Sequence, residues 1–139
     1  MAFVLVSKRI NLAEDRINSR KPINISFRER QTRKGKANFL IVFLDKHMLE
    51  KFSIKDKTKF LIYFDDVNNN LWRLQKTINQ DKYAYKLVVR GRNALGVLTI
   101  DQKRFVGLNL KHKDLIVKSI DDIKFIDENT IEFELVAVD

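Results

Sequence analysis

Two short basic segments of this 139-residue chain are the clearest candidates for chemistry. Each is a glycine between two cationic residues, Lys34-Gly35-Lys36 in one place and Arg90-Gly91-Arg92 in the other. Glycine takes the positive φ that a tight reversal requires, and because it has no Cβ it lets the backbone approach a phosphate closely. The flanking side chains can then contact neighbouring phosphates. The triplets therefore predict two hairpin turns that bind anions.

The other polar groups favour structural roles over catalysis. His47 and His112 have no cysteine and no second histidine or carboxylate at ligand spacing, so a zinc site is not predicted. Asp65-Asp66 and Asp121-Asp122 could pair as catalytic carboxylates or hold a cation, but each pair falls between two predicted strands, where aspartate caps a turn. No Ser-His-Asp pattern, phosphate-binding glycine loop or dinucleotide fingerprint is present. We therefore predict a protein that is not an enzyme and uses no metal or cofactor.

The charge of the chain favours a polyanionic partner. Lysine and arginine number 27 against 18 aspartates and glutamates, a net charge of +9. Cations crowd residues 28–36, whereas the chain from Asp121 onward is acidic, which indicates a basic face. Such a field attracts nucleic acid first, then anionic lipid or an acidic protein. The alternative is that a lysine-rich and asparagine-rich composition reflects coding bias and solubility.

Length and composition indicate one domain. A chain with 45% hydrophobic residues is long enough for one compact core. The absence of cysteine excludes a disulfide scaffold and fits a reducing compartment. The apolar start at residues 2–6 lacks the preceding cations of a secretory signal, and no apolar run approaches the roughly 20 residues that span a bilayer. We expect a soluble, cytoplasmic protein that does not associate with membranes.

A repeat of 56 residues relates the two triplets. Gly91 follows Gly35 by 56 residues, and Asp101 follows Asp45 by the same interval. Between and beyond these positions, apolar residues match apolar residues without a gap. Any two β-rich segments share some of this pattern, but a register that also matches glycine, aspartate and lysine favours an internal duplication.

Each copy predicts the same series of elements: strand, basic turn, strand, short helix, strand, acidic turn, strand. The expected strands are residues 23–30, 39–44, 59–64 and 71–76 in the first copy, and 83–90, 95–100, 114–120 and 130–138 in the second. Asp45 and Asp101 are expected to cap helices of about two turns. One such unit leaves an apolar face open, so the two must pack together. We predict a mainly β protein with short helices: a small β-barrel of two strand-strand-helix-strand-strand repeats, at 23–80 and 81–139, after an N-terminal extension (1–22) with a strand and a possible short helix.

The run FLDKHMLEKFSIKDKTKFLIYFDDVNNNLWRLQK, preceded by a basic turn, resembles the swapped-hairpin barrels of the AbrB and MazE type. The resemblance covers about residues 28–76 and again 88–136. Members of that family pair two chains by interleaving their hairpins. The resemblance implies that this chain does so within itself, as a fused pseudo-dimer. The sequence leaves open whether this pseudo-dimer is a monomer or pairs again into a higher homo-oligomer.

The resemblance further implies a duplex-DNA partner, because basic hairpin side chains of AbrB-like proteins face the duplex. The candidate nucleic-acid-binding residues are Arg28, Arg30, Arg33, Lys34, Lys36, Arg90 and Arg92. Arginine pairs in bidentate fashion with guanine, which favours base contacts for Arg33, Arg90 and Arg92, with phosphate contacts for the others. With both turns on one side, related by a pseudo-twofold axis, they would suit a roughly palindromic site in transcription control. The alternative for these cations is that they are solvated loop charges.

The sequence is also compatible with two other kinds of partner, an acidic protein and a single-stranded nucleic acid or RNA. The basic face can bind an acidic protein, as an interaction module of the antitoxin or phage-inhibitor kind, because small barrels serve many functions. Binding of RNA or single-stranded DNA would need exposed aromatic rings for stacking. The strand pattern instead places Tyr63, Phe64 and Trp72 in the core.

Overall fold

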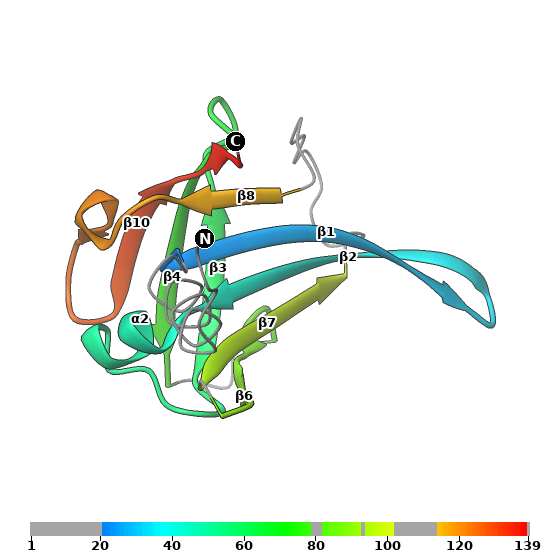
Figure 1. Ribbon diagram of the computed structural model, residues 1–139, viewed down its shortest axis with the longest axis horizontal. Helices are drawn as coiled ribbons and strands as arrows, with labels where there is room; N and C mark the ends of the chain where they lie inside the picture. Colours follow the sequence, from blue (N-terminus) through cyan, green and yellow to red (C-terminus); the bar gives the residue numbers. More distant parts are fainter. Residues whose placement is uncertain (1–20, 79–81, 93, 102–113, 139) are drawn as a thin grey trace, which may run out of the picture.

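The computed structural model describes residues 21–78, 82–92, 94–101 and 114–138. The elements are β1 (Ile23–Thr32), β2 (Gly35–Leu44), α2 (Lys46–Lys51), β3 (Lys59–Phe64), β4 (Leu71–Thr77), β5 (Tyr85–Lys86), β6 (Val88–Arg90), β7 (Leu95–Asp101), β8 (Asp114–Val117), η2 (Ile120–Asp122), β9 (Lys124–Phe125), β10 (Thr130–Glu134) and β11 (Val136–Ala137). They form two antiparallel sheets, so the prediction of a mainly β protein is confirmed (Figure 1). The expected N-terminal strand and helix, and the helix expected after Asp101, lie outside the described residues.

The first sheet has six strands in the order β11-β8-β1-β2-β7-β6. Its longest pairing joins β1 and β2, from Ile23 opposite Leu44 to Thr32 opposite Gly35. Ile23 and Ile25 are buried while the residues between and after them are half-buried, as the alternation of a strand requires. The buried side of this sheet forms one wall of the core.

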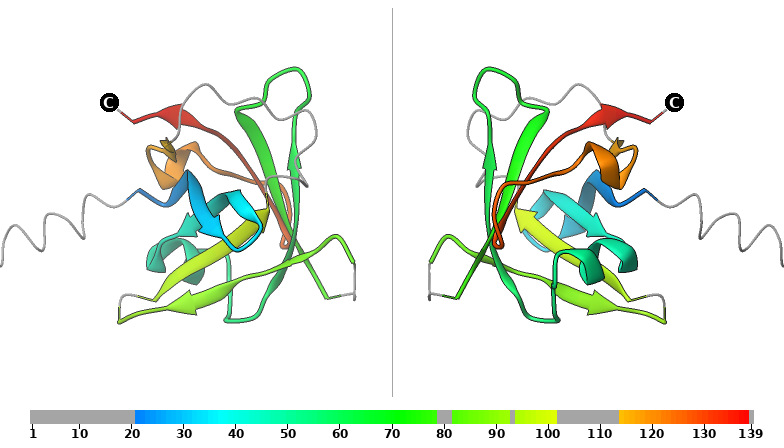
Figure 2. Two further views of the ribbon diagram at one scale, coloured as in Figure 1. Left: turned by 90° about the vertical axis from the view of Figure 1, so that its right-hand side faces the viewer. Right: turned by 90° about the vertical axis from the view of Figure 1, so that its left-hand side faces the viewer.

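The second sheet has the order β5-β3-β4-β10-β9 and forms the opposite wall. Phe60, Trp72 and Phe133 are its largest buried side chains, and they belong to the same core cluster as Ile23 and Leu44 of the first sheet. Figure 2 shows the green and orange strands of the second sheet beside the blue, cyan and yellow-green strands of the first.

The helix α2 begins where the sequence predicts. The Asp45 side chain accepts a hydrogen bond of 2.7 Å from the backbone N–H of Met48, the geometry of an N-cap. Met48 and Leu49 are buried, and Phe52, which is also buried, ends the helix. Within the described ranges, no helix is long and apolar enough to cross a membrane.

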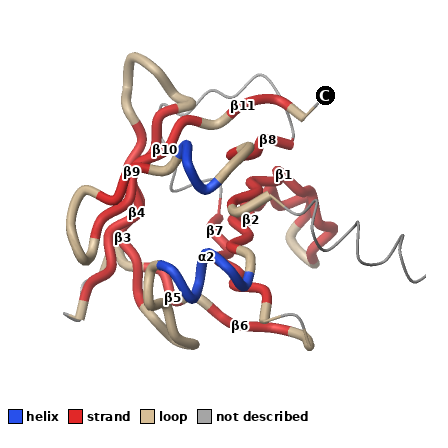
Figure 3. Tube along the Cα trace, turned by 60° about the vertical axis from the view of Figure 1, so that its left-hand side comes forward, coloured by secondary structure: helices blue, strands red, loops and turns tan. Residues whose placement is uncertain are grey.

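The two sheets are not closed into a barrel, so that part of the predicted fold is wrong. The chain instead passes from one sheet to the other at Leu87, between β5 and β6, and at Leu135, between β10 and β11 (Figure 3). Both leucines are buried, and their backbone N–H groups donate to the carbonyls of Thr58 and Asn70. The expected strands 83–90 and 130–138 are each divided in two there. A strand that crosses from one sheet to another breaks its row of hydrogen bonds at the crossing point. A single continuous barrel would not require such a break.

Candidate nucleic-acid interface

The hairpin of β1 and β2 extends beyond the other strands of the described residues (Figure 1). The strand β8 pairs with β1 only over residues 23–26, and β7 pairs with β2 only over residues 39–44. Residues 28–38 therefore pair with no other strand in the described part of the chain, and we call them the basic arm. Five residue steps along β1, from Arg28 to the turn, give the arm a length of about 17 Å.

The basic arm carries most of the predicted site. Arg28 and Arg30 lie in β1, Arg33 and Lys34 form the turn, and Lys36 begins the return along β2. Glu29 is the one carboxylate among residues 28–38. It pairs with Lys36 at 3.5 Å, but with side chains 53% and 72% exposed, so the pair adds little stability in water.

The tip of the arm is open to a ligand. The side chains of Arg33 and Lys34 are exposed and form no ion pair with a described carboxylate. Gly35 has a φ of +113°, and a Cβ added there would meet no atom within 4 Å. The Thr32 hydroxyl donates to the Gly35 carbonyl at 2.6 Å and fixes the turn. The predicted glycine conformation is therefore confirmed, and the backbone at the tip is accessible from outside.

The second triplet lies at the far end of the sheet, which corrects the expectation that both turns share one side. Its glycine, Gly91, also has a positive φ, of +77°. Because β7 runs antiparallel to β2, Gly96 at the start of β7 lies opposite Leu44 at the end of β2. In the pairing of β6 with β7, Arg90 lies opposite Leu95, so the second turn is at the Leu44 end of β2. Nine residue steps along β2 separate that end from Gly35, a distance of about 30 Å.

The second turn is also shorter than the arm. Its strand β6 has three residues and is held against the protein, since the Asp56 carboxylate accepts a hydrogen bond of 2.9 Å from the backbone N–H of Val89. Arg90 and Arg92 are exposed. The predicted candidates thus divide into five on a projecting arm and two on a short turn beside a carboxylate.

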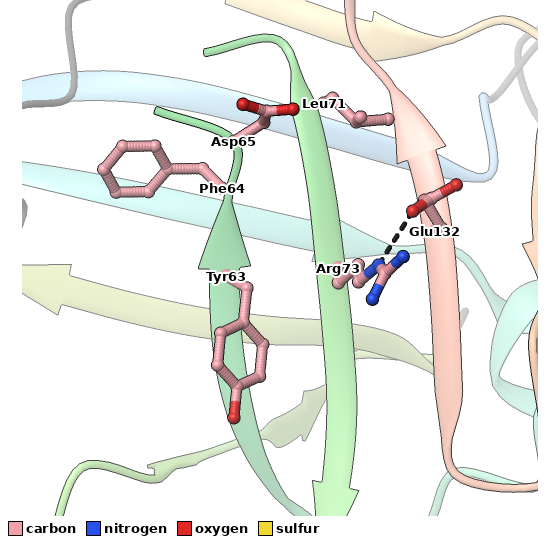
Figure 4. Close-up of a pocket in the computed structure, with 6 residues that line it drawn as sticks. All are labelled: Tyr63, Phe64, Asp65, Leu71, Arg73 and Glu132. Atoms are coloured by element: carbon pink, nitrogen blue, oxygen red, sulfur yellow. Dashed lines mark hydrogen bonds and ion pairs between the residues drawn. The ribbon is translucent and has the colours of Figure 1, made fainter. Parts of the chain in front are cut away.

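A depression on the second sheet is the other candidate site (Figure 4). It has a volume of about 230 Å³ and is lined by Tyr63, Phe64, Asp65, Leu71, Arg73 and Glu132. Arg73 donates to the Glu132 carboxylate at 2.7 Å, which neutralises its charge, and the Asp65 carboxylate lies on the same wall. These groups leave the depression acidic, so it is not suited to a polyanion. No sequence pattern predicts the Arg73–Glu132 pair, because the partners are 59 residues apart on different strands.

The aromatic residues are only partly where the sequence predicts. Trp72 is fully buried, and its indole N–H donates to the Asn69 carbonyl, while Phe64 packs against the core. Tyr63 is 49% exposed, so its predicted core position is wrong: its side chain alternates outward from the buried Phe60 side of β3. Tyr83 and Phe125 are also exposed, at 65% and 40%, so exposed aromatic rings of the kind that single-strand binding uses are present among the described residues.

Both aspartate pairs lie between strands, but the predicted capping of a turn is confirmed for the first pair and not for the second. Backbone N–H groups of Val67 and Asn68 donate to the Asp65 carboxylate and hold its pKa below the usual 3.8. Asp121 and Asp122 lie in the short helix η2, which is capped by Ser119, whose hydroxyl accepts a hydrogen bond of 3.2 Å from the backbone N–H of Asp121. No group of three or more histidines or carboxylates that could hold a metal ion occurs among the described residues.

Comparison with known proteins gives no relative: no family model matches the chain, and no curated protein and no solved structure is similar to it.

Proposed function

We propose that this protein binds duplex DNA through the basic arm and acts as a non-enzymatic, cytoplasmic regulator of transcription. The observation that carries the proposal is the arm itself, a two-stranded ribbon that projects about 17 Å and bears five cationic residues against one carboxylate. Duplex DNA presents one negative charge per roughly 1.7 Å of its axis. A rod of cations of this length is complementary to such a target.

The positions of the cations suggest separate roles. Arg33 and Lys34 form the turn at the tip of the arm, so they extend furthest from the sheet toward a ligand. Arginine can pair with a guanine edge in bidentate fashion, whereas lysine acts as a point charge on phosphate. Arg28 lies four residues before Thr32, and its guanidinium is 5.5 Å from the centre of the Phe43 ring, which places it nearer the sheet. We therefore assign base contact to Arg33 and phosphate contact to the other cations.

We also propose that the chain is an internally duplicated pseudo-dimer related to the AbrB and MazE type. The strand pairing supports this proposal. In the first sheet β2 of the first half lies beside β7 of the second, with Val42 opposite Leu98, residues 56 apart. In the second sheet β4 lies beside β10, again one strand from each half. A local twofold axis between each pair would relate the two halves.

This arrangement changes the kind of DNA site that is expected. The turns lie about 30 Å apart at opposite ends of the sheet, and one projects while the other does not. We therefore propose one dominant contact by the arm, with Arg90 and Arg92 as auxiliary phosphate contacts on a longer duplex. Such an interface does not require a palindrome.

A second function, binding to an acidic protein, is favoured by a different observation. Both edges of the arm lack a partner strand among the described residues, and an open edge can accept a strand from another protein. Cations along the arm would then select an acidic segment.

A mobility-shift experiment separates these functions. Three probes, a 30-base-pair DNA duplex, a 30-nucleotide single-stranded DNA and a 30-base-pair RNA duplex, are titrated with protein at low and moderate salt. The test variant is Arg33→Gln/Lys34→Gln, and the matched control is Lys118→Gln/Lys124→Gln, which removes the same charge from exposed sites outside the arm. The proposal predicts loss of the duplex shift in the test variant alone. Equal losses in both variants would refute the arm as the contact surface. No shift together with recovery of a stoichiometric acidic protein in a pull-down would refute DNA binding.

A further inference from the structure

We infer that the basic arm enters the major groove of B-form DNA with its tip toward the base edges, and that the major groove of duplex RNA excludes it. This inference rests on the proposed function and names the groove that the arm uses. It follows from the shape of the arm rather than from its charge.

The width of the arm fits one groove. Paired strands lie about 4.8 Å apart, so with the van der Waals envelope of both backbones the ribbon is roughly 10 Å wide in its own plane. The major groove of B-DNA is about 12 Å wide and admits a two-stranded ribbon, whereas the minor groove is about 6 Å wide. The arm therefore enters the major groove without deforming the duplex, and it would have to force the minor groove open.

The length of the arm fits the depth of the same groove. The major groove is about 8.5 Å deep, and the arm projects about 17 Å. The turn at Arg33 and Lys34 therefore reaches the floor, where guanine presents its O6 and N7 acceptors. Arg28 lies four residues before Thr32, about 14 Å behind it, and remains at the level of the phosphates.

The conformation of the tip supports close approach. Gly35 leaves its side of the turn without a side chain, and no atom lies within 4 Å of where a Cβ would stand. The hydrogen bond from Thr32 to Gly35 holds the turn in one conformation. A fixed turn gives up less conformational freedom when it inserts.

Duplex RNA presents a different surface. Its A-form major groove is deep and narrow, so side chains on a ribbon cannot reach the bases. Its minor groove is wide and shallow, which leaves phosphate and ribose contacts for the arm. We expect binding to duplex RNA to be at least roughly tenfold weaker than binding to DNA of the same length and salt.

Groove competition tests the inference. Methyl green, which occupies the major groove, and netropsin, which occupies the minor groove, are both cationic and are titrated separately into the wild-type complex with a 30-base-pair duplex. Methyl green is expected to displace the protein at concentrations where netropsin does not. A second duplex carries 7-deazaguanine, which removes the N7 acceptor, and is expected to bind about fivefold more weakly. Arg33→Lys keeps the charge but cannot pair in bidentate fashion, so this variant is expected to lose that fivefold difference.

The outcomes distinguish this inference from the proposed function. Displacement by netropsin instead of methyl green, or equal affinity for DNA and RNA duplexes that still depends on Arg33 and Lys34, would overturn major-groove entry and leave arm-mediated binding intact. Binding that does not depend on Arg33 and Lys34 would overturn both.

Discussion

Neutralising the tip of the basic arm should weaken DNA binding by an amount that depends on salt in a calculable way. Each phosphate contact releases counterions and contributes about −0.9 to the slope of log affinity against log salt concentration. On a duplex of arbitrary sequence, which offers Arg33 no chosen base, all five cations of the arm count as phosphate contacts and contribute about −4.5 to the slope for the wild type, to which Arg90 and Arg92 add at most about −1.8. Replacing Arg33, Lys34 and Lys36 with glutamine leaves two contacts on the arm, so the slope becomes shallower by about 2.7. At 0.1 M salt the three lost contacts correspond to about 500-fold weaker binding, and the two curves should converge near 1 M.

Fluorescence anisotropy with a labelled 30-base-pair duplex of arbitrary sequence measures these slopes, because phosphate contacts do not depend on sequence. The matched control is Lys55→Gln/Lys118→Gln/Lys124→Gln, three exposed lysines outside the arm. Both variants lose three charges, so an effect of net charge would reduce both slopes equally. Parallel curves for the wild type and the arm variant would refute the assignment of the arm as the contact surface. The substituted side chains are exposed, so thermal melting should be unchanged in both variants.

Three further changes have expected outcomes. Glu29→Gln removes the one carboxylate of the arm, so the same anisotropy assay should show binding up to about eightfold tighter at 0.1 M salt; unchanged or weaker binding would contradict this. Arg90→Gln/Arg92→Gln should reduce the slope by at most about 1.8 on a 30-base-pair duplex and have little effect on a six-base-pair hairpin, which at about 20 Å is too short to reach both turns; an equal effect on both would place the turns together. Asp45→Ala removes the N-cap of α2 and should lower the free energy of unfolding in urea by about 1 kcal/mol, while Asp45→Asn should retain most of it. The carboxyl of Asp65 should titrate below 3.8 by NMR, and the stability that its turn adds should be present above that pH and be lost as the pH falls through the lowered folded-state pKa.

Local rules predicted the elements because they depend on neighbouring residues. The alternation in β1, the continuous apolar run in β2, the cap at Asp45 and the positive φ at Gly35 and Gly91 each follow from a few consecutive residues, and each is confirmed. The order strand, turn, strand, helix, strand, turn, strand is confirmed for residues 23–77. The equivalent helix of the second half lies outside the described residues.

The relation between the two turns could not be predicted in the same way. It depends on which strands pair and in which direction, and an apolar pattern carries no information about direction. The antiparallel pairing of β2 with β7 sends the two hairpins to opposite ends of the sheet. The division at Leu87 depends on the second sheet as well, since the Leu87 backbone forms hydrogen bonds with Lys57 and Thr58, the two residues before β3.

The projecting arm did have a sequence signal. Residues 28–36 read RERQTRKGK, with no large apolar residue at any position. A hairpin without an apolar residue on either face has no side chain to pack against the core, so it is expected to project into the solvent. The residues on either side of the arm follow a regular strand pattern, and that pattern predicts the two strands. It does not predict whether other elements pack against them, so the projection of the arm was not predicted.

A ribbon with two polar faces is marginal in isolation, so its order must come from elsewhere. The inner halves of the same two strands provide it: Ile25 and Val42 are buried and lie opposite one another in the ladder that continues outward to Thr32 and Gly35. Insertion of an arm that is already paired does not require the ordering of a flexible loop, which would oppose binding by about 1–2 kcal/mol for each residue fixed. The same buried pairs therefore hold the core together and keep the cations of the arm at fixed spacing, which is the property that a groove-binding ribbon needs.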